Sequence, residues 1–504
     1  MPGPLDDDLT RPLEGAAEAA SAEGPTGPAV GRDEWVARHG ERITRRSGVA
    51  GTLEARLAAV PWWAWLTLLV AAACLVPVVS DSGYVRRVAF DTVVFMLLAL
   101  GLNIVVGWGG LLDLGYVAFF GIGAYAYAML ASDQFGVHLP SIVAIPLVAL
   151  IGFVAGWLVG LPSRRLTGDY LAIVTLFFFQ IFLTFTNNGD DVFGRSLTNG
   201  PNGILDLDAF SFFGWTLSTT TAQGQFGIAY LYAAIVVFGI VYVALRLLND
   251  SRTGRAWRSL REDPLAAELM GMPVNWLKLL AFAFGASVAA LTGTLTAALN
   301  GSVFPQDFAF PLLIAVYTMV ILGGAGSQLG VVIGAILISV LLEVLRDPGD
   351  SRSMFYMLAL LALVGVFRLS RQLAVVLGGT IVLGFAARAV AGAIDDRWTE
   401  GMQGSGRVAD WSSEWVIVPT QLASWIAPVT YIGLIALVLM LSLLHGWVRI
   451  AVLVPTLYLA AFVWENVMLA KPEPTRYVVL GAILVAVMIV RPNGLLGERR
   501  VEIV

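Results

Sequence analysis

The stretch NDSRTGRAWRSLREDPLAAELMGMPVNW, residues 249–276, separates two long apolar segments and sets the topology expected for the rest of the chain. It carries four arginines, at positions 252, 255, 258 and 261, although only 13% of the chain is charged. A polar, alanine-rich segment between two membrane spans lies in water, and its arginines indicate the cytoplasmic side. A short cytoplasmic helix in such a protein is typical of a docking site for another protein.

The composition predicts an all-α, polytopic membrane bundle. The chain has 504 residues, of which 58% are hydrophobic, and its mean hydropathy of +0.78 excludes an ordinary soluble globular protein. A helical span needs about 20 apolar residues. Fourteen segments come close to this length: 61–80, 87–107, 112–131, 139–161, 170–186, 226–248, 277–299, 309–325, 328–346, 353–368, 373–393, 430–446, 448–468 and 476–490.

Positive charge tests the order of these spans. With the N-terminus inside and the spans alternating, the cytoplasmic loops hold Arg164–Arg165, 249–276, Arg368–Arg371 and the C-terminal arginines. The long loops 188–225 and 394–429, which are poor in positive charge, fall outside. Two pairs break the rule because they also fall outside, namely Arg86–Arg87 and Lys471–Arg476. Both termini are therefore expected in the cytoplasm, and residues 1–60 are expected to be a disordered acidic tail.

Small residues indicate where helices pack closely. Gly152, Gly156 and Gly160 form a GxxxGxxxG pattern, and glycines 326, 330 and 334 form another. Seven glycines between residues 101 and 130 predict broken or re-entrant helices there, since irregular backbone inside a membrane needs protein or a cavity around it. The segment 323–335 repeats the glycine rhythm of 109–124, which suggests an internal duplication.

The sequence lacks the residues of an energy-converting site. It contains no GxxxxGK[ST] loop, no HExxH or GxSxG motif, one cysteine and three histidines, so no bound nucleotide, cofactor or metal is expected. No basic patch with interleaved aromatic residues points to nucleic acid. The few acidic residues near the spans are expected to be interfacial or capping rather than an ion relay: Asp91, Asp113, Glu343 and Glu465. A partner must therefore supply the energy.

Several motifs, in order, resemble one known family. They are LNIVVGWGGLLDLGYVAFFGIGAYAYAML (102–130), LTGDYLAIVTLFFFQI (166–181), LTNGPNGI (197–204), SRTGRAWRSLREDPLAAELMGM (251–272), LKLLAFAFGASVAALTGTL (277–295), VILGGAGSQLGVVIGA (320–335) and VRPNGLLG (490–497). This set, which covers roughly 85–368 and the last thirty residues, is similar to the LivM-type permeases of bacterial branched-chain amino acid ABC transporters. Closely similar permeases serve urea and short amides.

The resemblance implies an importer subunit of the bacterial cytoplasmic membrane, surrounded by lipid, that carries a small amino acid. It implies ABC ATPase subunits that use ATP, a sister permease in a heterodimer, and a periplasmic or extracellular solute-binding protein. Two other readings stay open from the residues. One is an autonomous channel or secondary carrier, and the other is a membrane enzyme or scaffold, for which residues 369–475 offer no catalytic cluster.

The resemblance also implies that the segment near 252–271 is a coupling helix received by an ATPase. The spacing of Arg258 and Glu262 predicts an ion pair, and Asp263 before Pro264 predicts a cap for a second helical turn. Leu265, Ala266, Leu269 and Met270 then form an apolar patch. The residues expected to couple to the ATPase are Arg255, Arg258, Arg261, Glu262, Asp263, Pro264, Ala266 and Gly271.

Two further sets are expected around the pathway. Uncharged polar or small residues inside spans are candidates for the translocation path, although such residues more often join helix to helix: Asn103, Gly121, Tyr125, Thr175 and Gln180. The outward turn could face the binding protein or be a plain turn: Thr198, Asn199, Gly200, Asn202 and Gly203.

The chain departs from the family between its last spans. Both MFYMLALLALVGVFR (354–368) and TRYVVLGAILVAVMIVRPNGLLG (475–497) resemble the family's final helix. We therefore expect a permease core of about ten spans over 61–368, an insertion of about three to four spans over 369–475, and a final span with a cytoplasmic C-terminus over 476–504. A lipid-facing elaboration is the default role of the insertion, and a dock for the binding protein or another subunit is the alternative.

Overall fold

The computed structural model describes residues 61–163, 166, 168–191, 196–212, 215–218, 220, 227–368, 370–401, 407–491 and 493–497. The tail over residues 1–60 lies outside this part. Contacts divide the chain into two compact units, Met1–Thr67 and Leu68–Val504, and the elements from α5 onward lie in the second.

The all-α bundle is confirmed, and each predicted span coincides with a helix. In the described part, 12 helices are long and apolar enough to cross a membrane, and two shorter apolar helices accompany them. The long ones are α4 (Trp62–Val79), α5 (Gly83–Leu102) with its π-helical continuation η2 (Asn103–Trp108), α7 (Ser141–Ser163), α8 (Asp169–Asn188), α9 (Ile228–Asp250), α12 (Val274–Asn300), α13 (Phe310–Gly323) with the preceding 3-10 turn η4 (Pro305–Phe308), α15 (Pro348–Phe367), α16 (Arg371–Ile394), α18 (Ile426–Leu443), α19 (Gly446–Val463) with its π-helical end η6 (Trp464–Met468), and α20 (Pro472–Val490). The shorter ones are α6 (Tyr116–Leu130) and α14 (Gln328–Val344).

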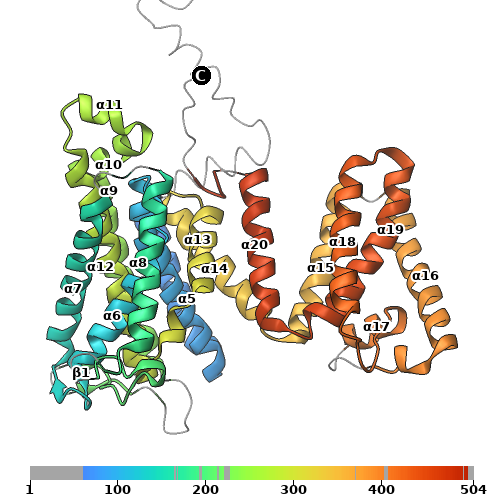
Figure 1. Cartoon of the computed structure of the whole chain (residues 1–504), viewed down its shortest axis with the longest axis horizontal. Coiled ribbons are helices and arrows are strands. Elements are labelled where there is room, and N and C mark those ends of the chain that lie inside the picture. The colour runs from blue at the N-terminus through green and yellow to red at the C-terminus, as the bar shows by residue number, and fades with distance from the viewer. Residues whose placement is uncertain are drawn as a thin grey trace, which may run out of the picture. The chain divides into compact units, whose positions relative to one another are not determined.

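The expected core over 61–368 is built around α12, which packs against α7, α6 and α5 (Figure 1). The predicted glycine contacts are present there. A Cβ at Gly156 would come within 2.5 Å of the Phe282 carbonyl oxygen on α12, so only glycine permits this approach. Gly330 and Gly334 on α14 likewise face the backbone of α13.

The expected break in the helices lies between α5 and α6. After the π-helical residues Asn103–Trp108, the chain leaves the helix and resumes it at Tyr116. The 15 residues of α6 measure about 22 Å at 1.5 Å per residue, which is shorter than a bilayer core of about 30 Å. Its backbone is enclosed by α12, α7 and α8, as irregular structure at this depth requires.

Short strands and turns close the opposite end of the core from α10 and α11 (Figure 1). The strands in the described residues have two residues each and form antiparallel pairs: β1 (Ala131–Ser132) with β2 (Val137–His138), β3 (Ile204–Leu205) with β6 (Ser302–Val303), and β4 (Ser211–Phe212) with β5 (Trp215–Thr216). The 3-10 turn η3 (Gly200–Asn202) precedes β3.

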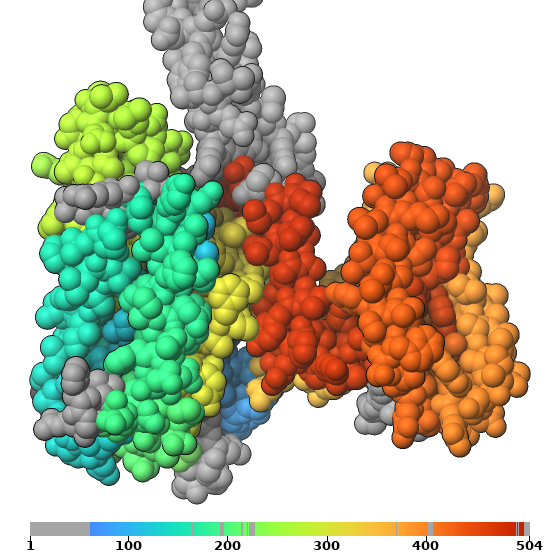
Figure 2. Space-filling model, viewed as in Figure 1, coloured from blue at the N-terminus to red at the C-terminus, as the bar shows by residue number. Residues whose placement is uncertain are grey.

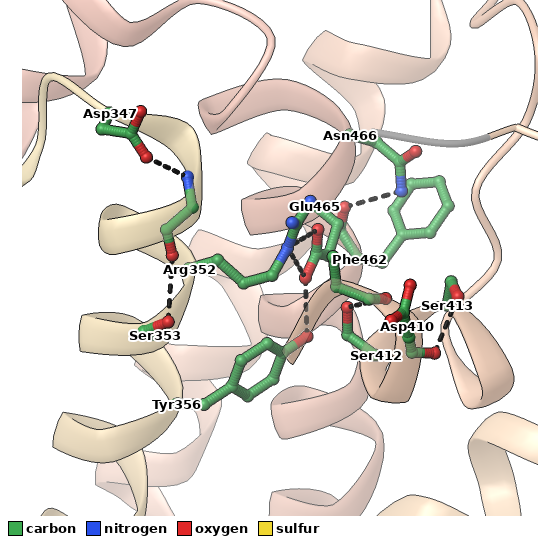
Figure 3. A network of polar contacts seen from close by, with 12 residues as sticks. Asp347, Arg352, Ser353, Tyr356, Asp410, Ser412, Ser413, Phe462, Glu465 and Asn466 are labelled. Atoms are coloured by element: carbon green, nitrogen blue, oxygen red, sulfur yellow. Dashed lines mark hydrogen bonds and ion pairs between the residues drawn. The ribbon is translucent and has the colours of Figure 1, made fainter. Parts of the chain in front are cut away.

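A polar network stabilises the region between α15 and α19 (Figure 3). The Nε of Arg352 donates to both carboxylate oxygens of Glu465, at 3.0 and 2.9 Å, and the Tyr356 hydroxyl donates to the same carboxylate at 3.0 Å. Both charged side chains are almost fully buried, with 3% and 1% of their surfaces exposed. Glu465 is therefore not the interfacial or capping residue expected, because it lies in the π-helical turn η6 and neutralises a buried arginine.

The tryptophans of the insertion build a core of their own. Trp415, at the end of α17 (Arg407–Trp415), is buried and packs with Trp398 of the 3-10 turn η5 (Asp396–Trp398) in one cluster. Tyr356 contacts the rings of both Trp411 and Trp415. Aromatic burial of this kind holds α15, α17 and α19 together.

α20 and α15, which both resemble the last family helix, have different neighbours. α20 packs against α13 of the core, and the turn after it donates from the Leu495 and Leu496 amides to the carbonyls of Leu322 and Gly323. α15 packs mainly with α16 and α17. At their base, Leu345 after α14 and Leu469 before α20 share one buried cluster with Trp464.

Candidate functional site

The 249–276 segment folds into two short helices, α10 (Arg252–Glu262) and α11 (Pro264–Leu269). The Ser251 hydroxyl accepts from the Gly254 amide and caps α10 at 3.3 Å. The predicted second cap is present, because the Asp263 carboxylate accepts from the amides of Leu265 and Ala266 at 2.9 and 3.0 Å. Each helix thus begins at a residue that satisfies its free N–H groups.

The far end of this hairpin presents apolar side chains to its surroundings. Leu265, Leu269 and Met270 expose 66%, 80% and 82% of their surfaces, and α10 and α11 project beyond the ends of the neighbouring spans (Figure 2). Ala267 alone turns inward from α11. A capped helix with an exposed apolar face outside the membrane spans is typical of a protein–protein contact.

The base of the hairpin is fixed by two tryptophans. Trp257 is fully buried, stacks on Trp108 with ring centroids 6.3 Å apart, and donates from Nε1 to the Leu277 carbonyl at 2.8 Å. Trp108 in turn donates to the Gly326 carbonyl at 3.0 Å. Through these contacts α10 is joined to α12, to the π-helix η2 and to the turn between α13 and α14.

Arg261 connects the same parts through its charge. One of its terminal nitrogens donates to the Gly107 carbonyl at 2.6 Å and to the Ala325 carbonyl at 3.4 Å. Gly326 has a φ of +97°, and a Cβ there would come within 2.5 Å of this guanidinium, so a larger residue would displace it. Charge-assisted bonds of this kind are stronger than neutral ones.

The predicted ion pair between Arg258 and Glu262 is absent. Arg258 instead donates to the Asn249 carbonyl at 3.3 Å, at the end of α9, and Glu262 is exposed. The free carbonyls at a helix C-terminus attract a cation, and this attraction wins over a solvated partner one turn away.

The predicted coupling residues therefore divide by position. Arg261 faces inward and Arg258 is half-buried, whereas the others are exposed: Arg255, Glu262, Asp263, Pro264, Ala266 and Gly271. Gly271 has a φ of +81° and ends the α11 turn, where its amide donates to the Glu268 carbonyl.

The residues predicted for the pathway do not gather in one place. Asn103 is buried in η2, where its side-chain oxygen accepts from the Gly326 amide at 2.8 Å. Thr175 accepts from the Leu114 amide at 2.9 Å, and Gln180 lies on the exposed face of α8. Gly121 and Tyr125 do come together, because both contact Phe182.

A cavity of about 360 Å³ adjoins Tyr125 and Phe182 and is lined almost wholly by apolar side chains. The Tyr125 hydroxyl is buried and makes no hydrogen bond within the described residues.

The LTNGPNGI turn folds back on the core. The Thr198 hydroxyl donates to the Thr186 carbonyl at 2.9 Å, and the Asn199 side chain donates to the Gly203 carbonyl at 2.9 Å. Thr198, Gly200 and Gly203 are buried, and Asn202 is exposed. The arrangement is that of a self-bonded turn.

His138 lies in β2, at the same end of the core as the LTNGPNGI turn. Its ring contacts Asp208 at 2.7 Å and Asp133 at 3.3 Å. The hydrogen bond to the Asp208 carboxylate raises the pKa of His138 above its usual 6.5.

Sequence reasoning missed Trp108 and Trp257, which fix the base of the hairpin. A bulky aromatic residue inside an arginine-rich, water-exposed segment was the available signal, since it marks the one face of that helix that must be buried.

Known membrane permeases are similar to this chain in sequence. Residues 84–367, more than half of the chain, match the family model described as "Branched-chain amino acid transport system / permease component". The high-affinity branched-chain amino acid transport system permease protein LivM of Salmonella typhimurium is 38% identical over 298 residues, which cover 56% of this chain and 68% of the relative. LivM of Escherichia coli is 37% identical over 321 residues, 60% of this chain and 73% of the relative.

A second kind of permease also matches. LivH of Salmonella typhimurium is 27% identical over 258 residues, 49% of this chain and 80% of the relative. No solved structure matches the chain significantly. The family match begins and ends within one residue of 85–368, the main range expected from the motifs, but it does not include the last thirty residues that were also expected. The chain belongs to the family of permease components of branched-chain amino acid transport systems.

Proposed function

We propose that this chain is the permease subunit of an ABC importer that carries branched-chain amino acids across a bacterial cytoplasmic membrane. Its termini and the α10–α11 hairpin lie in the cytoplasm, where an ATPase subunit receives the hairpin. A sister permease, a second ATPase and a solute-binding protein complete the assembly. ATP is bound by the ATPases, because this sequence has no phosphate-binding loop.

The observation that carries the proposal is the contrast between the two ends of the hairpin. Its tip exposes Leu269 and Met270, whereas its base is held by buried bonds from Trp257 and Arg261. An exposed apolar tip suits binding to a partner, and a rigid base suits transmission of that partner's motion.

The route of the motion follows from these contacts. When the ATPases close on ATP, they push α11, and α10 moves with α9 and α12, to which it is joined. Arg261 carries the displacement to Gly107 at the end of η2 and to the α13–α14 turn. A π-helix has a strained hydrogen-bond register, so η2 is the element able to change its winding when it is pushed.

Cross-linking tests the docking. Cys74 is the single cysteine, so Leu269→Cys in a Cys74→Ser background carries one reactive site. With a thiol-reactive photo-cross-linker, we expect this variant to become linked to an ATPase subunit in the intact assembly. Trp215→Cys is the matched control, because Trp215 is 82% exposed and Leu269 is 80% exposed. Equal linkage of both variants, or linkage of Trp215→Cys alone, contradicts the proposal.

We also propose that α20 is the last helix of the permease core, and that the insertion runs from α15 through η6. The support is the packing of α20 and of the Leu495–Leu496 turn on α13, with Leu345 and Leu469 close at the insertion's base. The insertion then begins before residue 369, the start expected from the motifs.

A further inference from the structure

A second cavity, of about 410 Å³, lies between α20 and the other helices of the core. Helices α5, α6, α12, α13, α14 and α20 and the turn η4 all contribute to its lining. Its volume is within the range of about 300–1,000 Å³ typical of small-molecule sites. None of the pathway residues expected from the sequence lines it.

Four charged side chains line this cavity, and two of them have ion-pair partners. Asp91 pairs with Arg87 at 3.2 Å, and Glu343 accepts from the Tyr84 hydroxyl and lies 3.6 Å from Arg346. Their charges are thereby largely balanced within the protein.

The other two charges, Arg476 and Asp307, have opposite signs and no ion pair among the described residues. The Nε of Arg476 is buried and makes no hydrogen bond there. Asp307 accepts only from the backbone amide of Phe304, at 3.1 Å. Arg476 as a whole is half-buried, but a buried N–H donor without an acceptor is costly, which points to an acceptor that the cavity receives from outside.

Apart from these four charged residues the lining is mainly apolar, which suits an aliphatic side chain. Phe95, Phe120, Phe308, Leu312, Leu342 and Leu480 face the same space. An α-amino acid carries one anionic group, one cationic group and, in the branched-chain members, an aliphatic body. The cavity offers a complement to each of the three.

The position of Arg476 in the membrane topology is also unusual. In the proposed topology Arg476 lies on the outer side, against the usual cytoplasmic bias of arginine. Asp307 precedes α13 at that same side. A charge retained where topology disfavours it, and left without a partner in a cavity, is typical of a functional site.

We propose that this outer cavity receives the amino acid released by the binding protein, with Arg476 binding the α-carboxylate, Asp307 binding the α-ammonium and the apolar wall holding the side chain. This rests on the proposed importer function. It adds a substrate site whose key arginine comes from α20, beyond the region that the family model matches.

Transport in the reconstituted assembly gives the first test. At saturating leucine-loaded binding protein, Arg476→Gln should lower ATP-driven leucine uptake about tenfold, since a bond between charged groups is worth about that factor. Asp307→Asn should have a similar effect, and Arg476→Lys should retain most of the uptake. Lys471→Gln is the control, because Lys471 is exposed at the same end of α20 and does not line the cavity. Wild-type uptake by Arg476→Gln overturns the proposal.

Protection from labelling gives a readout independent of ATP. Gln306 is exposed and lines the cavity, so Gln306→Cys with Cys74→Ser reports access to it. We expect leucine to slow labelling by a thiol reagent, leucinol (which lacks the carboxylate) to protect less, and Arg476→Gln to abolish protection. If the wild-type assembly fails to transport leucine yet leucine protects, the importer proposal fails and the site stands. Absence of protection, or protection by urea but not leucine, overturns the site.

Discussion

Arg261 is the side chain at which α10 contacts both η2 and the turn between α13 and α14. Its guanidinium donates to the carbonyls of Gly107 and Ala325, which belong to segments more than sixty residues away in the sequence. Trp257 and Trp108 add a buried ring stack beside it. In the proposed importer, the motion of a partner would therefore reach η2 through few and identifiable contacts.

We predict that Arg261→Gln uncouples ATP hydrolysis from transport. Loss of charge-assisted bonds worth about 1.5–3 kcal/mol should lower leucine uptake about tenfold or more, with the subunits still assembled. The measurement is uptake per ATP hydrolysed in proteoliposomes. Arg252→Gln is the control, because Arg252 is exposed at the start of α10. The same ratio in both variants would show that Arg261 is not a coupling contact.

His138 gives a pH-dependent contact at the other end of the core. Asp208 raises its pKa, so the stabilising contact is fully present below the unfolded pKa of about 6.5 and is lost as the pH rises through the higher folded pKa. The chain has three histidines, which makes NMR titration of this ring practicable. We expect Asp208→Asn to lower the pKa of His138 more than Asp133→Asn does. A larger effect of Asp133→Asn would show that Asp133, and not Asp208, has the dominant influence on the pKa of His138.

Much of the site could be predicted from local sequence, and the rest depends on tertiary contacts. The Asp263 cap and the exposure of Leu269 follow from residue types and spacing. The inward turn of Arg261 does not, because its acceptors lie on loops that only the folded bundle brings near. For the same reason Arg258 pairs with a helix end rather than with Glu262.

The helices themselves could be predicted from the sequence because membrane spans obey simple rules of length and polarity. The break after α5 followed from its glycines, and the GxxxGxxxG pattern predicted that α7 packs closely on another helix, although not that this helix is α12. The π-helical turns η2 and η6 were not predictable, since they have no distinct residue pattern. At η6 the turn places Glu465 against Arg352, which lies 113 positions earlier in the chain.

We predict that this buried pair stabilises the insertion. Glu465→Gln leaves Arg352 charged and buried, and breaking such a pair costs about 3–5 kcal/mol. Asp250→Asn is the control, because its pair with Arg246 is partly exposed and is worth about 0–1 kcal/mol. Thermal unfolding in detergent should show a lower midpoint for Glu465→Gln only. Equal midpoints for the two variants would mean that solvent reaches Glu465.

At the scale of the whole molecule, we propose a family core with an inserted bundle. Sequence comparison places α15 at the end of the family match, at residue 367, whereas the packing on α13 belongs to α20. Two helices of similar sequence could be told apart only by their neighbours. The outer cavity, formed in part by α20, was invisible to sequence reasoning for the same reason.

The most direct test of the account is leucine uptake by proteoliposomes that contain this chain with its ATPases, sister permease and binding protein. We expect accumulation against a gradient when ATP is present, and none when the ATPases are omitted or carry a substitution that blocks ATP hydrolysis. Uphill uptake by this chain alone, without any ATPase, would contradict the claim that a partner drives transport through α10 and α11.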